Sequence, residues 1–178
     1  MSIYTRTGDL GSTGLATGQK VLKSSPVIEF IGLVDEMNSV IGICVSSLEA
    51  EPEVDFTEEI EVLESIQMDL FVVGAVAAGA KMRFDALAEA ANIEKTIDDY
   101  EKILPKLTNF ILPGGAASAA HLHNARTVVR RIERHAVALK SQSLMSFVPY
   151  LNRLSDLLFV VARFVNQKLN VRETIWKS

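Results

Sequence analysis

Arginine side chains recur at four-residue intervals in the C-terminal half of this sequence, at Arg126, Arg130 and Arg134. On a helix this spacing places them in a stripe along one face, with Glu133 within reach of the Arg130 guanidinium. Apolar residues surround the stripe, so part of it is expected to lie near packed surface, where a guanidinium needs an anionic partner. A solvated helix face with an internal ion pair is the alternative interpretation.

Two further polar groups interrupt apolar helical patterns. Asn152, Ser155 and Asp156 share one face of a leucine-rich segment, where neighbouring helices, water or a ligand must satisfy them. Asp35 and Glu36 lie in an apolar segment nearer the N-terminus, and a carboxylate there could pair with one of the arginines across a helical bundle. A structural role and a functional role are both open for these residues.

The first 25 residues differ in composition from the rest of the chain. Glycines alternate with threonines and serines, which predicts a loop that turns tightly and presents many N–H and hydroxyl donors. With Arg6, Lys20 and Lys23 nearby, the loop is similar in composition to a phosphate cradle. It is not a Walker A loop, because no Gly-Lys-Ser or Gly-Lys-Thr sequence closes it. A flexible glycine-rich N-terminus is the alternative.

Composition narrows the class of protein. The 178 residues are 48% hydrophobic and 22% charged, which suits one compact domain. A net charge of −4 argues against general binding to nucleic acid or to anionic membrane surfaces, so an anion must be held by a local cluster of cations. The single cysteine, Cys44, excludes an internal disulfide and a thiolate zinc cage.

Other classes of function find little support. The three histidines, His121, His123 and His135, lack metal-ligand spacing, and no strand–serine–helix elbow points to a serine hydrolase. The start of the chain shows no signal or transit pattern. The longest apolar stretch is expected at residues 70–80, and this stretch is too short to span a bilayer. The expectation is a cytoplasmic protein with no membrane and no nucleic acid partner.

Apolar residues at three- and four-residue steps predict five helices after Pro26, over residues 27–49, 57–80, 93–104, 116–140 and 150–169. Thr57 and Asn92 are the expected caps, and residues 81–91 are open between a loop and a frayed helix. No strand-like alternation is seen. The pattern predicts an all-α fold, a single domain over 1–178 in which a glycine-rich loop, 1–25, precedes a five-helix antiparallel bundle, 27–170.

Taken together, these segments resemble one family, the PduO-type ATP:cob(I)alamin adenosyltransferases. The resemblance covers nearly the whole chain in the family's order. It rests on Lys23 and on five stretches, which are Tyr4-Thr-Arg-Thr-Gly-Asp-Leu-Gly-Ser-Thr13, Gly32-Leu-Val-Asp-Glu-Met-Asn-Ser39, Phe110-Ile-Leu-Pro-Gly-Gly115, Ala125-Arg-Thr-Val-Val-Arg-Arg-Ile-Glu-Arg134 and Tyr150-Leu-Asn-Arg-Leu-Ser-Asp156.

The resemblance implies a homotrimer of such bundles, with the active site in the cleft between adjacent subunits. By similarity, the N-terminal loop wraps the triphosphate of ATP and the arginine stripe neutralises its oxygens. The ATP-binding residues implied in this way are Thr5, Arg6, Thr7, Gly8, Asp9, Gly11, Ser12, Thr13, Lys23, Arg130, Arg131, Glu133, Arg134 and Asn152. The catalytic residues implied are Arg130, Phe110, Asp35 and Arg126. Asp35 and Arg126 match an ion pair across the subunit boundary, and Phe110 matches the aromatic residue that closes the lower face of the corrin ring.

The reaction that the resemblance implies is attack of cobalt(I) on the 5′ carbon of ATP, which yields adenosylcobalamin and triphosphate. Such a displacement needs positioning and charge stabilisation, and the sequence offers no clear protein nucleophile. Mg²⁺ is expected to arrive with ATP, assisted by Glu133, with no metal site made by the protein alone.

The implied partners are ATP, cob(I)alamin or a related corrinoid as substrate, a reductase and a cobalamin-dependent acceptor enzyme. The alternative is a non-catalytic protein that senses ATP or a corrinoid, or that chaperones the cofactor, because the same motifs would serve binding alone.

Overall fold

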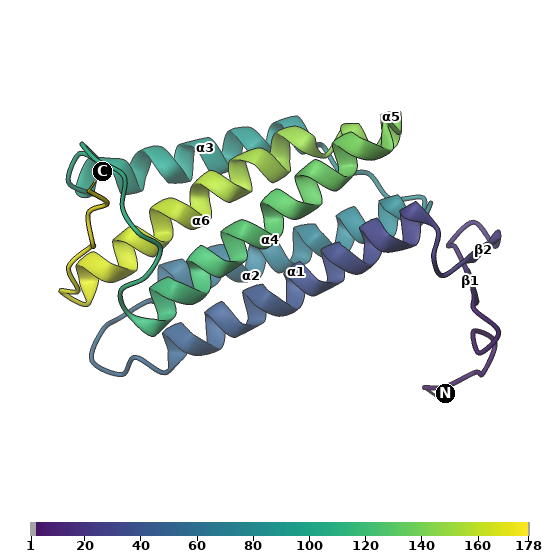
Figure 1. Cartoon of the computed structure of the whole chain (residues 1–178), viewed down its shortest axis with the longest axis horizontal. Coiled ribbons are helices and arrows are strands. Elements are labelled where there is room, and N and C mark those ends of the chain that lie inside the picture. The colour runs from purple at the N-terminus through teal and green to yellow at the C-terminus, as the bar shows by residue number, and fades with distance from the viewer. Residues whose placement is uncertain (1–2, 178) are drawn as a thin grey trace.

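A bundle of long antiparallel helices forms the body of the protein in the computed structural model, which describes residues 3–177. The long helices are α1 (Pro26–Glu49), α2 (Thr57–Ala77), α3 (Ala86–Ile103), α4 (Ala117–Leu139) and α6 (Val148–Lys168). A single-turn helix, α5 (Gln142–Met145), lies in the connection from α4 to α6 (Figure 1). α4 contacts α1 and α6, α2 packs on α1, and α3 packs on α6. The predicted bundle of five long helices is confirmed.

The helices form because their apolar residues meet in one core. Phe30, Met37, Ile41 and Cys44 of α1 are fully buried, and they follow the three- and four-residue steps read from the sequence. Burial raises the pKa of the Cys44 thiol to about 12, so this thiol is a packing group and not a nucleophile.

Among the described residues, the segment Gln142–Lys168 is long and apolar enough to cross a membrane by length and composition alone. The mean hydropathy of its most apolar window is 1.3, and 56% of that window is buried inside the bundle, as in a core helix. α6 touches both α3 and α4, which accounts for apolar residues around most of its circumference.

The capping groups of two helices differ from the sequence-based expectation, and so does the start of α3. α3 begins at Ala86, where Asp85 accepts a hydrogen bond from the Ala88 N–H at 3.1 Å, so Asp85 is the cap in place of Asn92. The start was missed because small alanines, and not large apolar residues, make up the buried face of its first turns. At the start of α2, Asp55 accepts a hydrogen bond from the Thr57 N–H at 3.0 Å. The Asp55 carboxylate, and not the Thr57 hydroxyl, therefore accepts from the backbone at this helix start.

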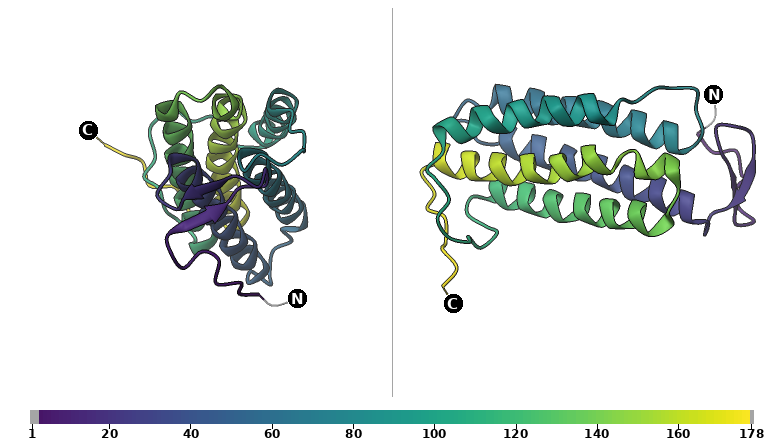
Figure 2. Two further views of the ribbon diagram at one scale, coloured as in Figure 1. Left: turned by 90° about the vertical axis from the view of Figure 1, so that its right-hand side faces the viewer. Right: turned by 90° about the horizontal axis from the view of Figure 1, so that it is seen from above.

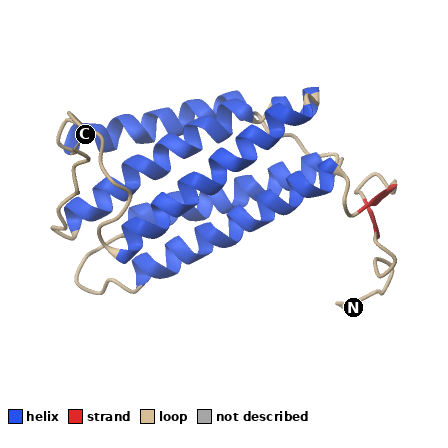
Figure 3. Ribbon diagram, in the orientation of Figure 1, coloured by secondary structure: helices blue, strands red, loops and turns tan. Residues whose placement is uncertain are grey.

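A small antiparallel hairpin in the N-terminal segment corrects the expectation of no strands. β1 (Ser12–Gly14) pairs with β2 (Lys20–Leu22), with Thr13 opposite Val21 (Figure 3). Strands of three residues are too short to show an alternating pattern. The Ala16 N–H donates to the Ala78 carbonyl at 2.9 Å, which ties the hairpin to the end of α2. The hairpin and the residues before it project beyond this end of the bundle (Figure 2).

The C-terminal segment lies at the opposite end of the bundle, beside the connection between α3 and α4 (Figure 1). Ile175 forms an antiparallel bridge with Ile111, and the Leu112 N–H donates to the Thr174 carbonyl at 2.8 Å. The glycine-rich loop and the Phe110 loop therefore occupy opposite ends of one chain.

Candidate functional site

The arginine stripe of α4 faces a groove between α3, α4 and α6 whose volume is about 410 Å³. Arg126 and Arg130 line it from α4, and Arg153 and Asp156 line it from α6. Arg134 is exposed one turn beyond and is not among the residues that line the groove. The structure thus brings two of the three predicted arginines to one concave surface.

Arg126 is partly buried, whereas the other two arginines of the stripe are exposed. Its Nε atom is buried and has no hydrogen-bond partner within residues 3–177. Burial lowers the pKa of Arg126, and the positive charge of Arg130 lowers it further. The anionic partner that the sequence predicted for a packed guanidinium is therefore not supplied by the described part of the same chain.

Acidic residues of α3 form the wall opposite these arginines, and sequence reasoning missed them. Glu94, Asp98 and Glu101 line the groove, and Glu94 accepts from Arg153 Nε at 2.6 Å. Their spacing of four and three residues was the available signal, although it is also typical of a solvated helix face.

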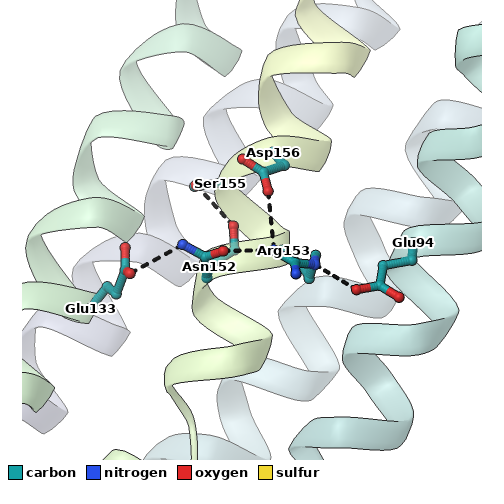
Figure 4. A network of polar contacts seen from close by, with 6 residues as sticks. All are labelled: Glu94, Glu133, Asn152, Arg153, Ser155 and Asp156. Atoms are coloured by element: carbon teal, nitrogen blue, oxygen red, sulfur yellow. Dashed lines mark hydrogen bonds and ion pairs between the residues drawn. The ribbon is translucent and has the colours of Figure 1, made fainter.

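A polar network holds Asn152 at the edge of this groove (Figure 4). Its side-chain amide donates to Glu133 Oε1 at 3.2 Å, and its Oδ1 accepts from Arg153 Nη1 at 2.7 Å. Ser155 donates to the Asn152 carbonyl at 2.9 Å. Glu133 was expected to orient Arg130, but its carboxylate accepts a hydrogen bond from Asn152. The network fixes the rotamers of Glu133 and Asn152 and so preorganises two of the predicted ATP-binding side chains.

Arg131 and Asp35 lie elsewhere on the molecule. Arg131 pairs with Glu36 of α1, so one of the two carboxylates at positions 35 and 36 pairs with an arginine across the bundle, as the sequence predicted. Arg131 is not among the residues lining the groove, because it faces α1 from the other side of α4. Asp35 lines a separate, mostly apolar groove of about 350 Å³ between α1 and α2. The predicted pair of Asp35 with Arg126 is not formed within one chain.

The N-terminal loop brings Lys23 next to the predicted phosphate-binding residues. The Lys23 N–H donates to the Gly11 carbonyl at 2.9 Å, and a Cβ added at Gly8 would lie 3.1 Å from Lys23 Nζ. Thr5 and Thr7 share a hydrogen bond of 2.8 Å between their hydroxyls. The other loop residues predicted to bind ATP, among them Arg6, Asp9, Ser12 and Thr13, lie in the same short segment, and none of them lines the arginine groove.

Phe110 lies at the other end of the bundle and is 77% exposed. Its ring meets the Trp176 ring edge to face, with 6.4 Å between centroids, and the Trp176 N–H donates to the Phe110 carbonyl at 2.8 Å. The two aromatics share a pocket of about 390 Å³ with residues 107–109. The contact between Trp176 and Phe110 could not be predicted, because 66 positions separate the two residues and no local pattern links their segments.

The turn that follows this pocket depends on Gly115 and Asn166. Asn166 of α6 is buried, accepts from the Ala116 N–H at 2.9 Å and donates to the Gly114 carbonyl at 3.0 Å. Gly115 has a φ of 107°, and a Cβ added there would lie 2.1 Å from Asn166 Oδ1. The turn therefore accepts only glycine at position 115.

Gly115→Ala is expected to lower the free energy of unfolding by about 2–4 kcal/mol, because it adds backbone strain and breaks the Asn166 hydrogen bonds. Urea unfolding monitored by circular dichroism measures the change. Gly18→Ala is the matched control, since Gly18 also has a positive φ of 84° but has open space around it. Equal destabilisation by both variants would contradict the role of Asn166.

His123 of α4 is a buried histidine that is expected to make the stability of the fold depend on pH. The residue is 3% exposed, packs edge-on against Phe159, and has no partner for either ring nitrogen within residues 3–177. Burial lowers the pKa of His123, and the charge of Arg126 lowers it further. The unfolded chain therefore takes up this proton at a higher pH than the folded chain does.

This contribution to stability is expected to be complete above about pH 6.5 and to fall below it by up to about 1.4 kcal/mol per pH unit. Urea unfolding at pH 7.5, 6.5 and 5.5 measures it as the difference between the unsubstituted protein and His123→Leu. His121→Gln, which alters an exposed histidine of the same helix, is the control. A His123→Leu protein with an unchanged pH slope would show that this imidazole does not titrate on unfolding.

Comparisons with known proteins identify the family. A family profile described as cobalamin adenosyltransferase matches residues 3–165. A cobalamin adenosyltransferase of Cupriavidus metallidurans is 41% identical over 178 residues, which span 98% of this chain and 94% of the relative. A corrinoid adenosyltransferase of Bacillus subtilis is 44% identical over 177 residues, which span 96% of this chain and 90% of the relative.

The fold is similar to that of a solved enzyme. A variant of the PduO-type ATP:corrinoid adenosyltransferase from Lactobacillus reuteri, complexed with cobalamin and ATP, gives a TM-score of 0.89 at 32% identity. The similarity spans 99% of this chain and 100% of that chain. With a family profile over nearly the whole length and relatives above 40% identity, the chain belongs to the cobalamin adenosyltransferase family.

Proposed function

We propose that this protein transfers the 5′-deoxyadenosyl group of ATP to cob(I)alamin, giving adenosylcobalamin and triphosphate. The observation that carries the proposal is the groove lined by Arg126 and Arg130, bordered by the Asn152 network, in a chain so similar to corrinoid adenosyltransferases. Arg126 and Arg130 line one wall of the groove, opposite the carboxylates of α3, and they are the positive charges that this wall offers to a polyanionic leaving group.

The reaction requires the protein to bind the substrates and to stabilise the developing charge, and it requires little acid–base catalysis. Cobalt(I) supplies the electron pair for a new cobalt–carbon bond, and the bond between the 5′ carbon and its oxygen breaks. Triphosphate leaves with about four negative charges, which Arg130 stabilises as they develop. Glu133 and Asn152 hold one another and present fixed polar groups to the nucleotide.

The ATP site is proposed to lie between two subunits of a homotrimer. The loop at residues 5–13 projects beyond the end of its own bundle and lines no part of its own groove, so it is available to a neighbouring chain (Figure 2). Lys23, which contacts Gly8 and Gly11, would approach the nucleotide with that loop. Arg134, one turn beyond Arg130, would meet the same phosphates at the rim of the groove.

The proposed subunit boundary would also account for two features of the single chain, an exposed apolar surface and an arginine without an anionic partner among the described residues. The α1–α2 surface exposes apolar side chains, among them Phe71, which is 76% exposed, and such surfaces mark interfaces. Asp35 lies in this surface, whereas Arg126 lacks an anionic partner. A contact of Arg126 with Asp35 of the partner subunit would satisfy the buried guanidinium.

Mg²⁺ is proposed to enter with ATP. Residues 3–177 contain no group of three His, Cys, Asp or Glu side chains placed to hold a metal ion, so phosphate oxygens would supply most of the ligands. The carboxylate of Glu133 is the kind of hard oxygen donor that Mg²⁺ accepts, and it lies beside Asn152. When bound, Mg²⁺ would share the charge of the triphosphate with Arg130.

Phe110 is proposed to cover the lower face of the corrin ring. An apolar ring there excludes the lower axial ligand and water, which makes cobalt(II) easier to reduce. A reductase would deliver the electron, and a cobalamin-dependent enzyme would receive the product.

A turnover assay tests the function. The protein is mixed with ATP, Mg²⁺ and chemically reduced cobalamin, and cobalt–carbon bond formation is followed by absorbance. The mass of the particle is measured in the same buffer, and a trimer is expected. Binding of ATP and corrinoid without turnover would contradict the catalytic proposal and favour a sensor or a cofactor chaperone.

A further inference from the structure

Arg153 of α6 lines the arginine groove, and the proposed reaction assigns no role to it. Its Nε donates to Glu94 Oε1 at 2.6 Å, and its Nη1 donates to Asn152 Oδ1 at 2.7 Å (Figure 4). The same Nη1 lies 3.5 Å from Asp156 Oδ2. Two carboxylates and an amide oxygen of the protein therefore hold this guanidinium, and the amide belongs to a side chain that is proposed to bind ATP.

The contacts of the Asn152 amide determine which way it points. Its nitrogen donates to Glu133 Oε1 at 3.2 Å, while its oxygen accepts from Arg153. An ionised carboxylate only accepts hydrogen bonds, and a guanidinium only donates them. If the amide group were turned over, its oxygen would face a carboxylate and its NH₂ group would face a guanidinium. Only the observed orientation satisfies both neighbours.

This orientation leaves a donor for a ligand. The amide nitrogen carries two hydrogens, of which one meets Glu133, and the other is bonded to no group of residues 3–177. ATP carries hydrogen-bond acceptors on its phosphate, ribose and adenine groups. An N–H held in one direction loses less conformational entropy on binding such an acceptor than a freely rotating amide does.

The ion pair of Arg153 with Glu94 is too exposed for stability to explain it. The two side chains are 39% and 52% exposed, and exposed ion pairs contribute little to the free energy of unfolding. Glu94 belongs to α3, whose carboxylates line the groove without a role in the proposed reaction. Orientation of Asn152 accounts for the pair and connects α3 with the ATP site.

We propose that Arg153 is a positioning residue of the ATP site, held by Glu94 of α3, and that it fixes the Asn152 amide with an N–H directed at the nucleotide. The inference rests on the proposed function, because it takes Asn152 as a contact of ATP. It goes beyond that function by giving Arg153 and Glu94 a role in ATP affinity that requires no contact with ATP.

A double-mutant cycle on ATP affinity tests this role. Isothermal titration calorimetry with ATP and Mg²⁺ measures the dissociation constant of each variant. Arg153→Met removes the donors but keeps an unbranched side chain, and it is expected to raise the dissociation constant at least about 10-fold. The same substitution in an Asn152→Ala background is expected to change it by less than about 2-fold, because Arg153 acts through that amide.

Glu94→Gln is the second variant, since glutamine still accepts from Arg153 but lacks the charge that holds it. It is expected to raise the dissociation constant about 3-fold, and this effect is also expected to vanish in the Asn152→Ala background. Lys102→Met is the matched control, because it removes a cation from an exposed ion pair of α3, with Asp99, outside the groove. The control is expected to keep the ATP affinity, and all three single variants are expected to keep the urea midpoint of the unsubstituted protein.

Two calorimetric results would overturn the inference. Losses that add in the cycle would show that Arg153 binds ATP directly or supports the fold. An unchanged dissociation constant in both Arg153→Met and Glu94→Gln would show that the pair has no part in binding.

Steady-state kinetics separate a positioning role from a general defect. In Arg153→Met the KM for ATP is expected to rise, while the KM for cob(I)alamin changes by less than about 2-fold. An equal rise in both KM values would assign Arg153 to the fold and overturn the inference.

Failure of the proposed function looks different. An unsubstituted protein that binds ATP but forms no cobalt–carbon bond would contradict that function, and the cycle would still decide the role of Arg153. An unsubstituted protein that binds no ATP would overturn both.

Discussion

Arg130→Ala is expected to lower kcat/KM for ATP by at least about 100-fold, a loss of about 3 kcal/mol in transition-state stabilisation. Arg130 is exposed in the single chain and lines the groove beside Arg126, whose Nε atom is buried. A guanidinium that meets the leaving triphosphate stabilises the charge that develops in the transition state, so its removal is costly. Steady-state kinetics with varied ATP and preformed cob(I)alamin measure the effect.

Arg83→Ala is the control for charge alone, because Arg83 is exposed in the loop before α3, away from the groove. It is expected to keep the unsubstituted kcat/KM. Arg131→Ala tests the difference between sequence and structure, since Arg131 pairs with Glu36 and does not line the groove. A near-normal kcat/KM in Arg130→Ala would remove Arg130 from the proposed mechanism.

Phe110→Ala is expected to keep ATP binding and to slow the reaction from cob(II)alamin by about 30- to 150-fold. Burial of a phenylalanine ring is worth about 2–3 kcal/mol, and here that free energy favours the corrinoid without its lower ligand. The rate from preformed cob(I)alamin is expected to fall much less, because cobalt(I) needs no further reduction. Parallel assays from the two cobalt states measure the ratio.

Leu112→Ala is the matched control, since Leu112 belongs to the same loop and is exposed but does not line the pocket. Its backbone bond to Thr174 does not depend on the side chain and is retained. Equal rates from cob(II)alamin in Phe110→Ala and the unsubstituted protein would exclude Phe110 from control of the lower ligand.

Periodicity sufficed to predict the bundle and part of the site. Apolar steps placed α1, α4 and α6 within two residues of their ends, because each buries large side chains on a regular face. The same spacing rule put Arg126 and Arg130 on one face, and the groove contains both. α3 was too short in the prediction because Ala86 and Ala90 are weak apolar signals, although both are buried.

The sequence does not predict which side chains from different helices form hydrogen bonds or ion pairs with one another. Glu133 is three residues from Arg130, yet its recorded hydrogen bond comes from Asn152 of another helix. Asp35 and Glu36 are neighbours in sequence, and only the helix rotation decides that Glu36 meets Arg131. An antiparallel bridge between residues 111 and 175 brings Trp176 next to Phe110, and no local sequence pattern predicts this bridge. Such contacts depend on the packing of whole elements.

In the proposed function the two ends of the chain would have different roles. The glycine-rich loop leaves the bundle at one end, and the connection between α3 and α4, which carries Phe110, lies at the other (Figure 1). In the proposed homotrimer each centre would combine the loop of one chain with the groove of its neighbour, so a damaged loop would impair only the centre that it reaches. The groove of the same chain would remain usable by the loop of the other neighbour. Loop and groove defects would therefore be complementary, and a mixed trimer of the two inactive forms would retain a working centre wherever an intact loop meets an intact groove.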